Sequence, residues 1–335
     1  MEHKPKLHSV DQRTAVVTGV SGQDGYYLSQ LLMEKGYQVI GQSRKHSTSS
    51  TSKHPTGSFH PVNFDVTSND EWRNVLSDYA VDEVYHLAGM SFVPDCENDP
   101  MGAFSSNVQS VVALMEAIRT SLPNCRVLCA SSSEILDRRC GALDEHTPIR
   151  PQSMYGMTKA SGFQIVQLYR QRYDLFACNA ILFNHESVRR PKRFVIRKIS
   201  HGVASIAAGV ARHIELGALD IYRDWGSAPE YVDCMVRCLA HDQACDFVIG
   251  SGVPTQLQSL VVAAFDEVGL DWKDHVRINL EFARSGDESV WFANPSKAFQ
   301  LLGWKAVTPI EQVVRSLVRY DLSLLTEQLT YRNAG

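Results

Sequence analysis

The feature of this sequence that most constrains its fold is an alternation of apolar, strand-like runs with helix-length amphipathic stretches. The runs are continuously apolar, which is typical of strands in a parallel sheet that is covered on both faces. The predicted strands lie at 14–20, 37–41, 81–89, 125–131 and 175–183, and the helices lie near 26–35, 70–79, 100–120 and 154–171. This order predicts an α/β fold with a doubly wound parallel sheet.

Three glycines separate the first predicted strand from the first helix. Gly19, Gly22 and Gly25 have a spacing that suits a tight turn, close approach of backbone amides to a pyrophosphate, and close packing of helix on strand. We therefore expect a Rossmann domain that binds a dinucleotide. The alternative is that these are turn glycines without a ligand.

The end of the second strand predicts which dinucleotide is bound. NAD-binding proteins place an acidic residue there for the ribose 2′-hydroxyl, whereas this chain has Gln42, Ser43, Arg44 and Lys45. Two cations and no carboxylate favour NADP, unless both are ordinary solvated charges. Asp65, in the segment NFDV (63–66), is expected to contact the adenine from a third loop, with a turn or cap role as the alternative.

Beyond residue 184 the alternation weakens, with predicted helices near 194–208, 256–268 and 308–326 and a short strand at 246–250. We expect residues 12–183 to form the Rossmann domain, joined by return segments from about 217–255. Residues 184–335 would mainly form a smaller C-terminal substrate-binding lobe. The Ser/Thr-rich segment 46–58 is predicted to be an exposed loop.

The composition sets limits on compartment and partners. The chain has 335 residues, is 44% hydrophobic and 21% charged, and carries a net charge of -4, which gives no overall reason to bind nucleic acid or a membrane. The eight cysteines form no C-x-x-C pair, so reduced thiols in the cytoplasm are expected. We find no run of about 18 uncharged apolar residues and no ligand spacing for a metal, so neither a membrane span nor a metal is expected.

A tyrosine and a lysine open the predicted helix at 154–171. The spacing Tyr155-x-x-x-Lys159 puts both side chains on one face of a helix, one turn apart. A phenol is a poor base at neutral pH, but a nearby ammonium stabilises the phenolate. The pair could therefore take a proton from a sugar hydroxyl while a nicotinamide takes the hydride.

The fourth strand ends in serines and a glutamate, 130-ASSSEILDRRCG-141. Ser131-x-x-Glu134 has the form of a capping box, although the following residues lead quickly to Gly141 and do not form an amphipathic pattern. Further along, six cations fall within 189–198. Such a segment suits the diphosphate of a sugar nucleotide, with a solvated helix start or a nucleic-acid patch as alternatives.

The chain at this point resembles a known family. The glycine loop, HLAG at 86–89, the serine-rich strand end and Tyr155-x-x-x-Lys159 resemble an extended short-chain dehydrogenase/reductase. More specifically, LFNHESVRR (182–190), FVIRKI (194–199), LGALDIYRDWGSAPEYV (216–232) and LGWK (302–305) resemble GDP-mannose 4,6-dehydratase. The resemblance covers nearly all of residues 14–325.

The resemblance implies a catalytic set and two binding sets. Ser132, Glu134, Tyr155 and Lys159 would be catalytic, with Tyr155 deprotonating the sugar 4-hydroxyl and Glu134 removing the C5 proton before water leaves from C6. Cofactor contacts would come from Gly19, Gly22, Gln23, Asp24, Gly25, Arg44, Asp65, Val66, Leu87, Ala88, Tyr155 and Lys159. Substrate contacts would come from Ser91, Val93, Asn184, Arg189, Lys198, Arg223, Arg284 and Glu288.

The chain also departs from the family pattern at several places. The family has threonine where this chain has Ser132, tyrosine at Leu136, asparagine at Ala218 and histidine at Ser227. The expected reaction is NADP-dependent conversion of GDP-mannose or a close GDP-sugar, a heptose being an alternative, to the 4-keto-6-deoxy product. The expected assembly is a homodimer or homotetramer. A sugar-nucleotide 4-reductase or epimerase, and a non-catalytic NADP-binding regulator, remain as alternatives.

Overall fold

The computed structural model describes residues 12–44, 57–282 and 290–333 of the chain. These residues divide into two compact units. Unit 1 comprises residues up to Ser131, Gln152–Ala180 and Met235–Asp246, and unit 2 comprises Ser132–Pro151, Ile181–Cys234 and the chain from Phe247 onward.

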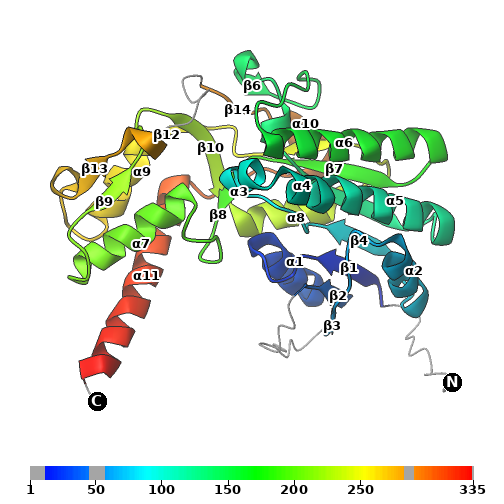
Figure 1. Ribbon diagram of the computed structural model, residues 1–335, viewed down its shortest axis with the longest axis horizontal. Helices are drawn as coiled ribbons and strands as arrows, with labels where there is room; N and C mark the ends of the chain where they lie inside the picture. The colour runs from blue at the N-terminus through cyan, green and yellow to red at the C-terminus, as the bar shows by residue number, and fades with distance from the viewer. Residues whose placement is uncertain (1–11, 45–56, 283–289, 334–335) are drawn as a thin grey trace. The chain divides into compact units, whose positions relative to one another are not determined.

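A seven-stranded sheet in the order β11-β7-β5-β4-β1-β2-β3 confirms the predicted α/β fold (Figure 1). β1 pairs in parallel with both β2 and β4, and the central strands are fully buried. The strands are β1 (Thr14–Thr18), β2 (Gln38–Gln42), β3 (Ser58–Val62), β4 (Glu83–His86), β5 (Arg126–Ser132), β7 (Ala177–Leu182) and β11 (Phe247–Ile249).

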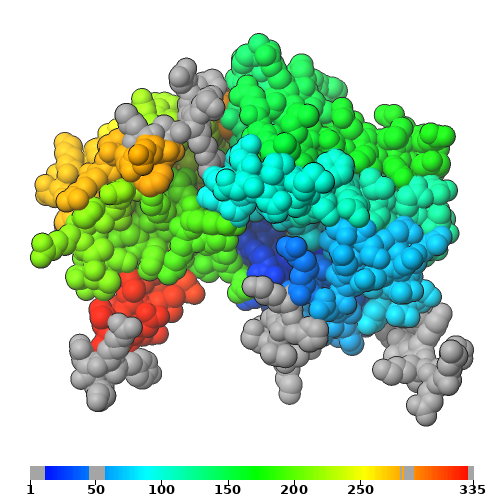
Figure 2. All heavy atoms as spheres, in the orientation of Figure 1, coloured from blue at the N-terminus to red at the C-terminus, as the bar shows by residue number. Residues whose placement is uncertain are grey.

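Helices of unit 1 cover this sheet. α2, α5 and α6 pack with the strands into one apolar core that includes Trp72, Leu114 and Val166, and α1 packs against β1 and β2. Exposed apolar side chains lie on two of the helices, with Met101 and Phe104 on α4 and Met157 on α6. In Figure 2 these two segments are cyan and green. The helices are α1 (Gln23–Glu34), α2 (Asn69–Asp78), α3 (Val93–Asn98), α4 (Pro100–Phe104), α5 (Ser110–Ser121) and α6 (Met154–Tyr173), with a π-helical turn at Ser105–Gln109.

Unit 2 combines short strands with three longer helices. β10 lies between β8, its parallel partner, and β12, its antiparallel partner, while β9 pairs with β13 and β6 with β14. The strands are β6 (Ala142–Leu143), β8 (Asn184–Glu186), β9 (Ile214–Leu216), β10 (Tyr222–Ser227), β12 (Pro254–Gln256), β13 (Val276–Ile278) and β14 (Phe292–Ala293). The helices of this part of the chain are α7 (Val195–Ala207), α8 (Ala228–Ala240), α9 (Leu257–Asp266), α10 (Ser296–Leu302) and α11 (Ile310–Asn333).

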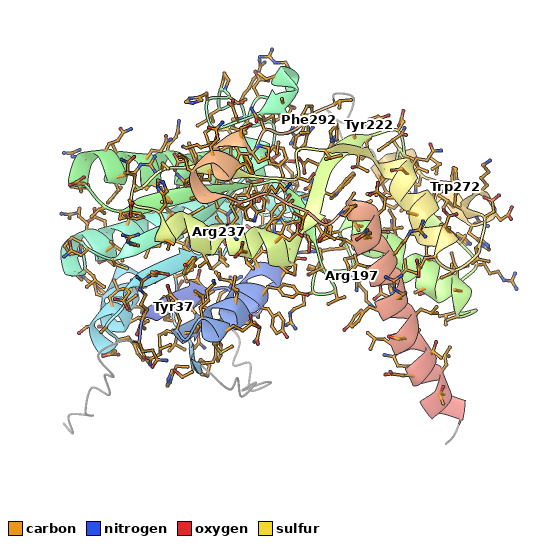
Figure 3. All side chains as sticks on the ribbon, turned by 180° about the vertical axis from the view of Figure 1, so that it is seen from behind. Tyr37, Arg197, Tyr222, Arg237, Trp272 and Phe292 are labelled. Atoms are coloured by element: carbon orange, nitrogen blue, oxygen red, sulfur yellow. The ribbon has the colours of Figure 1, made fainter. Side chains whose placement is uncertain are left out.

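The core of unit 2 lies between α7, α9 and α11. Ile199, Leu260 and Leu317 are almost completely buried there. A buried ion pair joins Arg197 of α7, labelled in Figure 3, to Asp321 of α11. The predicted helices near 194–208, 256–268 and 308–326 correspond to these three elements.

Several elements lie where the sequence predicted none, among them α8, β3 and the short strands of unit 2. α8 was not expected from the sequence; Pro229 fits its first turn, where a missing N–H costs little. β3 follows the predicted loop at 46–58, most of which lies outside the described residues.

Candidate active site

The glycine turn between β1 and α1 is built for close contact. Gly19 has a φ of 71°, a conformation that side chains disfavour. A Cβ at Gly25 would lie 2.3 Å from the Gly19 carbonyl oxygen, so only glycine lets α1 approach the turn so closely. α1 begins after Gly22, whose lack of a side chain leaves the first amides of the helix open to an anion. These residues fit the pyrophosphate of a dinucleotide.

Gln42, at the end of β2, holds this turn in place. Its carbonyl oxygen accepts from the amides of Gly19 and Val20, at 3.0 and 3.1 Å, and its side chain donates to the Phe64 carbonyl at 2.8 Å. The sequence suggested Gln42 only as a replacement for an acidic residue. Arg44 follows and is exposed, while Lys45 lies outside the described residues.

Asp65 and Val66 follow β3 at the start of the turn before α2. The Asp65 carboxylate accepts from the amide and hydroxyl of Thr67, at 2.9 and 2.8 Å, which is the turn role named as the alternative. Its side chain is exposed, whereas Val66 belongs to the apolar core.

The end of β4 is fixed by a hydroxyl and a neutral histidine. Thr18 Oγ1 accepts from the amides of Leu87 and Ala88, both at 3.0 Å, so its own proton goes to His86 Nδ1 at 3.1 Å. His86 therefore carries its proton on Nε2 and donates to Ser110 Oγ at 3.0 Å. Burial, with a smaller effect of Lys159, lowers the pKa of His86 to about 3, so the ring is neutral at physiological pH.

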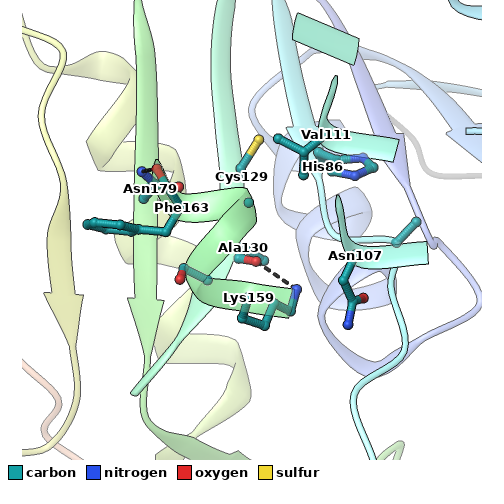
Figure 4. Close-up of a pocket in the computed structure, with 11 residues that line it drawn as sticks. His86, Asn107, Val111, Cys129, Ala130, Lys159, Phe163 and Asn179 are labelled. Carbon is teal, nitrogen blue, oxygen red and sulfur yellow. Dashed lines mark hydrogen bonds between the residues drawn. The ribbon is translucent and has the colours of Figure 1, made fainter. Parts of the chain in front are cut away.

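Lys159 is held beside β5 (Figure 4). Ser153 caps α6, and Lys159 lies one turn after Tyr155 on this helix. Its Nζ donates to the Ala130 carbonyl at 2.8 Å, and burial lowers its pKa to about 8. Tyr155 is 8% exposed and packs with Cys96 and Ala103.

Asn107 is a positioning residue that the sequence did not predict. It lies in the π-helical turn between α4 and α5, a kind of distortion that often occurs at functional sites. Its side chain accepts from the Met90 amide at 2.9 Å and donates to the Met90 carbonyl and to Thr158 Oγ1, both at 3.0 Å. It thereby links the loop after β4 to the helix that carries Tyr155 and Lys159. A small cavity beside Asn107 is lined by Ser131 and Lys159.

Ser132 and Glu134 begin unit 2. Ser132 ends β5, and its Oγ accepts from the Glu134 amide at 3.2 Å, so it is Ser132 that caps a 3₁₀ turn at Ser133–Ile135. No α-helix follows, so the capping-box alternative for Ser131 is wrong. The Glu134 carboxylate, with its side chain 21% exposed, forms an ion pair with Arg138.

The predicted substrate contacts are spread over several elements. Arg223 of β10 is buried, and its guanidinium lies 4.9 Å from the centroid of the Trp291 ring. Lys198 of α7 lies 4.1 Å from the Phe282 ring, and burial lowers its pKa. Asn184 begins β8, Arg189 and Ser91 are exposed, and Val93 begins α3. Arg284 and Glu288 lie outside the described residues.

The expected residues thus fall into two groups. The glycine turn, Tyr155 and Lys159 belong to unit 1, whereas Ser132, Glu134 and most of the expected substrate contacts belong to unit 2. Within the described residues, no cluster of three or more His, Cys, Asp or Glu side chains could hold a metal ion. Among the described helices, none is long and apolar enough to cross a membrane.

The parallel sheet and its glycine turn define an α/β protein with a Rossmann-type, doubly wound fold. Two solved structures share the fold: RMD from Pseudomonas aeruginosa complexed with NADPH (TM-score 0.78, 20% identity, 93% of this chain and 98% of that one), and dTDP-glucose 4,6-dehydratase from Bacillus anthracis in complex with NAD (TM-score 0.79, 18% identity, 92% and 96%).

The sequence comparison is more specific than the fold. The model of the GDP-mannose 4,6 dehydratase family matches residues 16–317. GDP-mannose 4,6 dehydratase 1 of Arabidopsis thaliana is 34% identical over 97% of this chain and 94% of its own length. The chain belongs to the GDP-mannose 4,6-dehydratase family and is an enzyme of the hydro-lyase class.

Proposed function

We propose that the protein is an NADP-dependent 4,6-dehydratase that converts GDP-mannose or a close GDP-sugar to its 4-keto-6-deoxy product. One observation carries the proposal beyond the family. Lys159 is bound to β5 at Ala130, and the same strand ends at Ser132, two positions before Glu134. The lysine proposed to stabilise the Tyr155 phenolate is thereby bonded to the strand that leads into the hydroxyl of Ser132 and the carboxylate of Glu134, and oxidation followed by elimination requires all three groups.

The residues at the glycine turn fit a nicotinamide dinucleotide, which when bound would accept a hydride and later return it. Arg44 supports NADP, because an arginine suits a 2′-phosphate. The two solved relatives carry different cofactors, NADPH and NAD. We expect Arg44→Ala to weaken NADPH binding about tenfold or more and to leave NADH binding nearly unchanged in a fluorescence titration. Equal losses for both would contradict the 2′-phosphate role.

The side chains would act in sequence on the sugar. Tyr155, its phenolate stabilised by Lys159, would take the proton of the 4-hydroxyl, while Ser132 would hydrogen-bond the same oxygen. The resulting ketone acidifies the C5 proton, which Glu134 would remove and then give to the departing C6 hydroxyl, so that water leaves and a C5–C6 double bond forms. Burial lowers the pKa of Lys159 to about 8, so the protonation of its amine can change near neutral pH. This supports its role beside Tyr155.

The proposal includes the organisation of the protein. Residues 12–183 would bind the dinucleotide, and residues 184–335 would mainly bind the sugar nucleotide. Exposed apolar side chains on α4 and α6, among them Met101 and Met157, support a homodimer or homotetramer. Eight free cysteines support a reducing, cytoplasmic location.

The test is incubation with GDP-, dTDP-, UDP- and CDP-sugars, followed by mass measurement. We expect loss of one water from a GDP-sugar only. A change at C4 without water loss would instead indicate a 4-reductase or epimerase. Tight NADPH binding without turnover of any sugar nucleotide would indicate a non-catalytic regulator.

Two variants test the assigned roles. Glu134→Gln should abolish water loss and retain part of the C4 oxidation, seen as NADPH absorbance. Tyr155→Phe should lose both steps, because C4 oxidation precedes elimination. Unchanged dehydration in either variant would refute the corresponding role.

A further inference from the structure

Arg138 has no role in the function proposed above, yet it is a buried cation beside the proposed base. Arg138 is 8% exposed, and its guanidinium forms an ion pair with the Glu134 carboxylate. Removing a charge from water is costly unless a partner compensates it. Such a contact is therefore expected to fix both side chains firmly.

Arg138 also contacts an aromatic ring. The Arg138 guanidinium lies 5.0 Å from the centroid of Trp291, which is completely buried, and Arg223 lies 4.9 Å from the same ring. A planar guanidinium packs well on an indole face, and the interaction is worth more when water is excluded. Trp291 therefore contacts both the partner of the proposed base and a proposed substrate residue.

Backbone pairing fixes this arrangement. β14, directly after Trp291, pairs with β6, directly after the Arg138 turn, through bonds from Phe292 N to Gly141 O at 3.0 Å and from Asn294 N to Leu143 O at 2.8 Å. The Asp224 carboxylate, next to Arg223, accepts from the Ala293 amide at 3.0 Å. Arg138, Trp291 and Arg223 are therefore held by three segments that are bonded to one another.

The other charges near this turn have partners of their own. Asp137 pairs with Arg139 at 2.5 Å and lies 3.9 Å from Arg150. Among the charged side chains described in unit 2, Arg138 is the one that forms an ion pair with Glu134. Arg223 contacts the Trp291 ring.

We propose that Arg138 is a positioning residue, which holds the Glu134 carboxylate ionised and oriented for removal of the C5 proton while Trp291 fixes its own guanidinium. The inference rests on the proposed function, since it takes Glu134 to be the base. An arginine so close to a carboxylate favours the charged form, while partial burial opposes it. Arg138 would thus extend the pH range of the elimination step toward acid, without acting on C4 oxidation.

The experiment compares Arg138→Met with Arg139→Met, a neighbouring arginine whose side chain is 63% exposed. C4 oxidation is followed by NADPH absorbance, and elimination by water loss and by exchange of the C5 proton with deuterated solvent. In Arg138→Met we expect elimination and exchange to fall at least tenfold, with C4 oxidation within about threefold of the original rate. The acid limb of the elimination rate should move up by about 1–3 pH units. Arg139→Met should match the original protein in all of these.

Arg138→Lys is the second variant, because it keeps the charge and should restore part of the acid limb even if Arg138→Met folds poorly. Equal behaviour of Arg138→Met and Arg139→Met would overturn the proposal, as would a loss of C4 oxidation and elimination in equal measure with an unmoved pH profile.

A double-mutant cycle of Glu134→Gln and Arg138→Met separates this proposal from the proposed function. The quantity measured for each variant is the midpoint of urea unfolding. Non-additive midpoints are expected if the two side chains interact in solution. Additive midpoints would overturn the pairing whatever the activity. Non-additive midpoints in a protein that dehydrates no GDP-sugar would leave the ion pair standing but overturn the proposed function, and with it the part of Arg138 in elimination.

Discussion

At the residue scale, Lys159 and His86 show how loss of hydration lowers the pKa of a basic side chain. Both belong to unit 1, His86 fully buried and Lys159 partly buried, and loss of hydration lowers both pKa values, to about 8 for Lys159 and about 3 for His86. Each is hydrogen-bonded, Lys159 to the Ala130 carbonyl and His86 to two hydroxyls. The histidine is thereby neutral and structural, while the lysine lies close to its titration point.

Lys159→Met should abolish turnover and change the pH dependence of stability. Because the pKa of Lys159 in the folded state is about 8, below its ordinary 10.5, the unfolded chain binds the proton more tightly. The buried ammonium therefore costs stability fully below pH 8, and that cost disappears as the pH rises from 8 to 10.5. The variant's advantage in free energy of unfolding should shrink by on the order of 3 kcal/mol across this window.

Urea unfolding of both proteins between pH 7 and pH 10.5 measures this difference. Other titrating groups are shared by the two proteins and cancel in the comparison. A difference that does not change with pH would mean that Lys159 keeps its ordinary pKa in the folded state.

At the element scale, single contacts decide how closely helices approach their neighbours. Gly25, in the first turn of α1, touches the backbone of the preceding glycine turn. α7 and α11 meet at an ion pair in which Arg197 and Asp321 are 3% and 2% exposed, and Ser200 donates to the same carboxylate at 2.8 Å. The contact at Gly25 is steric and the contact between Arg197 and Asp321 is electrostatic. Substitutions at the two places are therefore expected to destabilise the protein for different reasons.

Gly25→Ala should push α1 away from β1. The new Cβ would lie 2.3 Å from the Gly19 oxygen, whereas a Cβ at Gly22 would lie 3.2 Å from the same atom. We expect Gly25→Ala to lose about 1–3 kcal/mol of stability without cofactor and Gly22→Ala to lose clearly less. Thermal unfolding of the two variants, followed by dinucleotide titration, checks this order; a reversed order would contradict the close approach at Gly25.

Asp321→Ala should remove the main partner of the Arg197 guanidinium, whose charge would then be buried without compensation. Breaking a buried ion pair in this way costs about 3–5 kcal/mol. Asp266→Ala is the control, because Asp266 is 56% exposed and lies 3.7 Å from Arg315, also on α11; exposed pairs contribute about 1 kcal/mol or less. Urea unfolding should separate the two variants, and similar losses would mean that the Arg197 pair adds little.

At the scale of the whole molecule, the two units are interleaved along the chain. Unit 1 is completed by Met235–Asp246, which follows more than fifty residues of unit 2. Asp246 at the end of this segment accepts from Arg170 at 2.8 Å, from Gln167 at 2.8 Å and from the Asn179 amide at 3.0 Å. Unit 1 is therefore not a simple N-terminal half of the sequence.

A fragment ending at Phe183 should accordingly fail to fold cooperatively. It would keep Arg170 and Asn179 but lack Asp246, as well as α8 and β11, which complete the sheet and its cover. Circular dichroism during urea titration should show no sharp transition for the fragment and one for the full chain. A cooperative, NADPH-binding fragment would show that the return segment is dispensable.

The sequence predicted the elements that have a strong local pattern. β1, β4 and β5 lie within mainly apolar runs, and α6 and α11 are long and periodic, so each was recognised without knowing its neighbours. β9 and β10 were missed, because strands of a few residues are stabilised mainly by partners distant in the sequence. The helix α8 was missed as well. Of the candidate site, the glycine turn and the spacing of Tyr155 and Lys159 were readable for the same local reason.

What the tertiary structure alone decided is how these residues are surrounded. The sequence contains Arg138 and Trp291 but nothing in it indicates that the pairing of β6 with β14 brings them together. It likewise gives no sign that Asn107 binds both Met90 and Thr158, or that Lys159 is buried enough to lose affinity for its proton. Periodicity and spacing are local properties of a chain, whereas burial and charge pairing arise from contacts that form only when distant segments pack together.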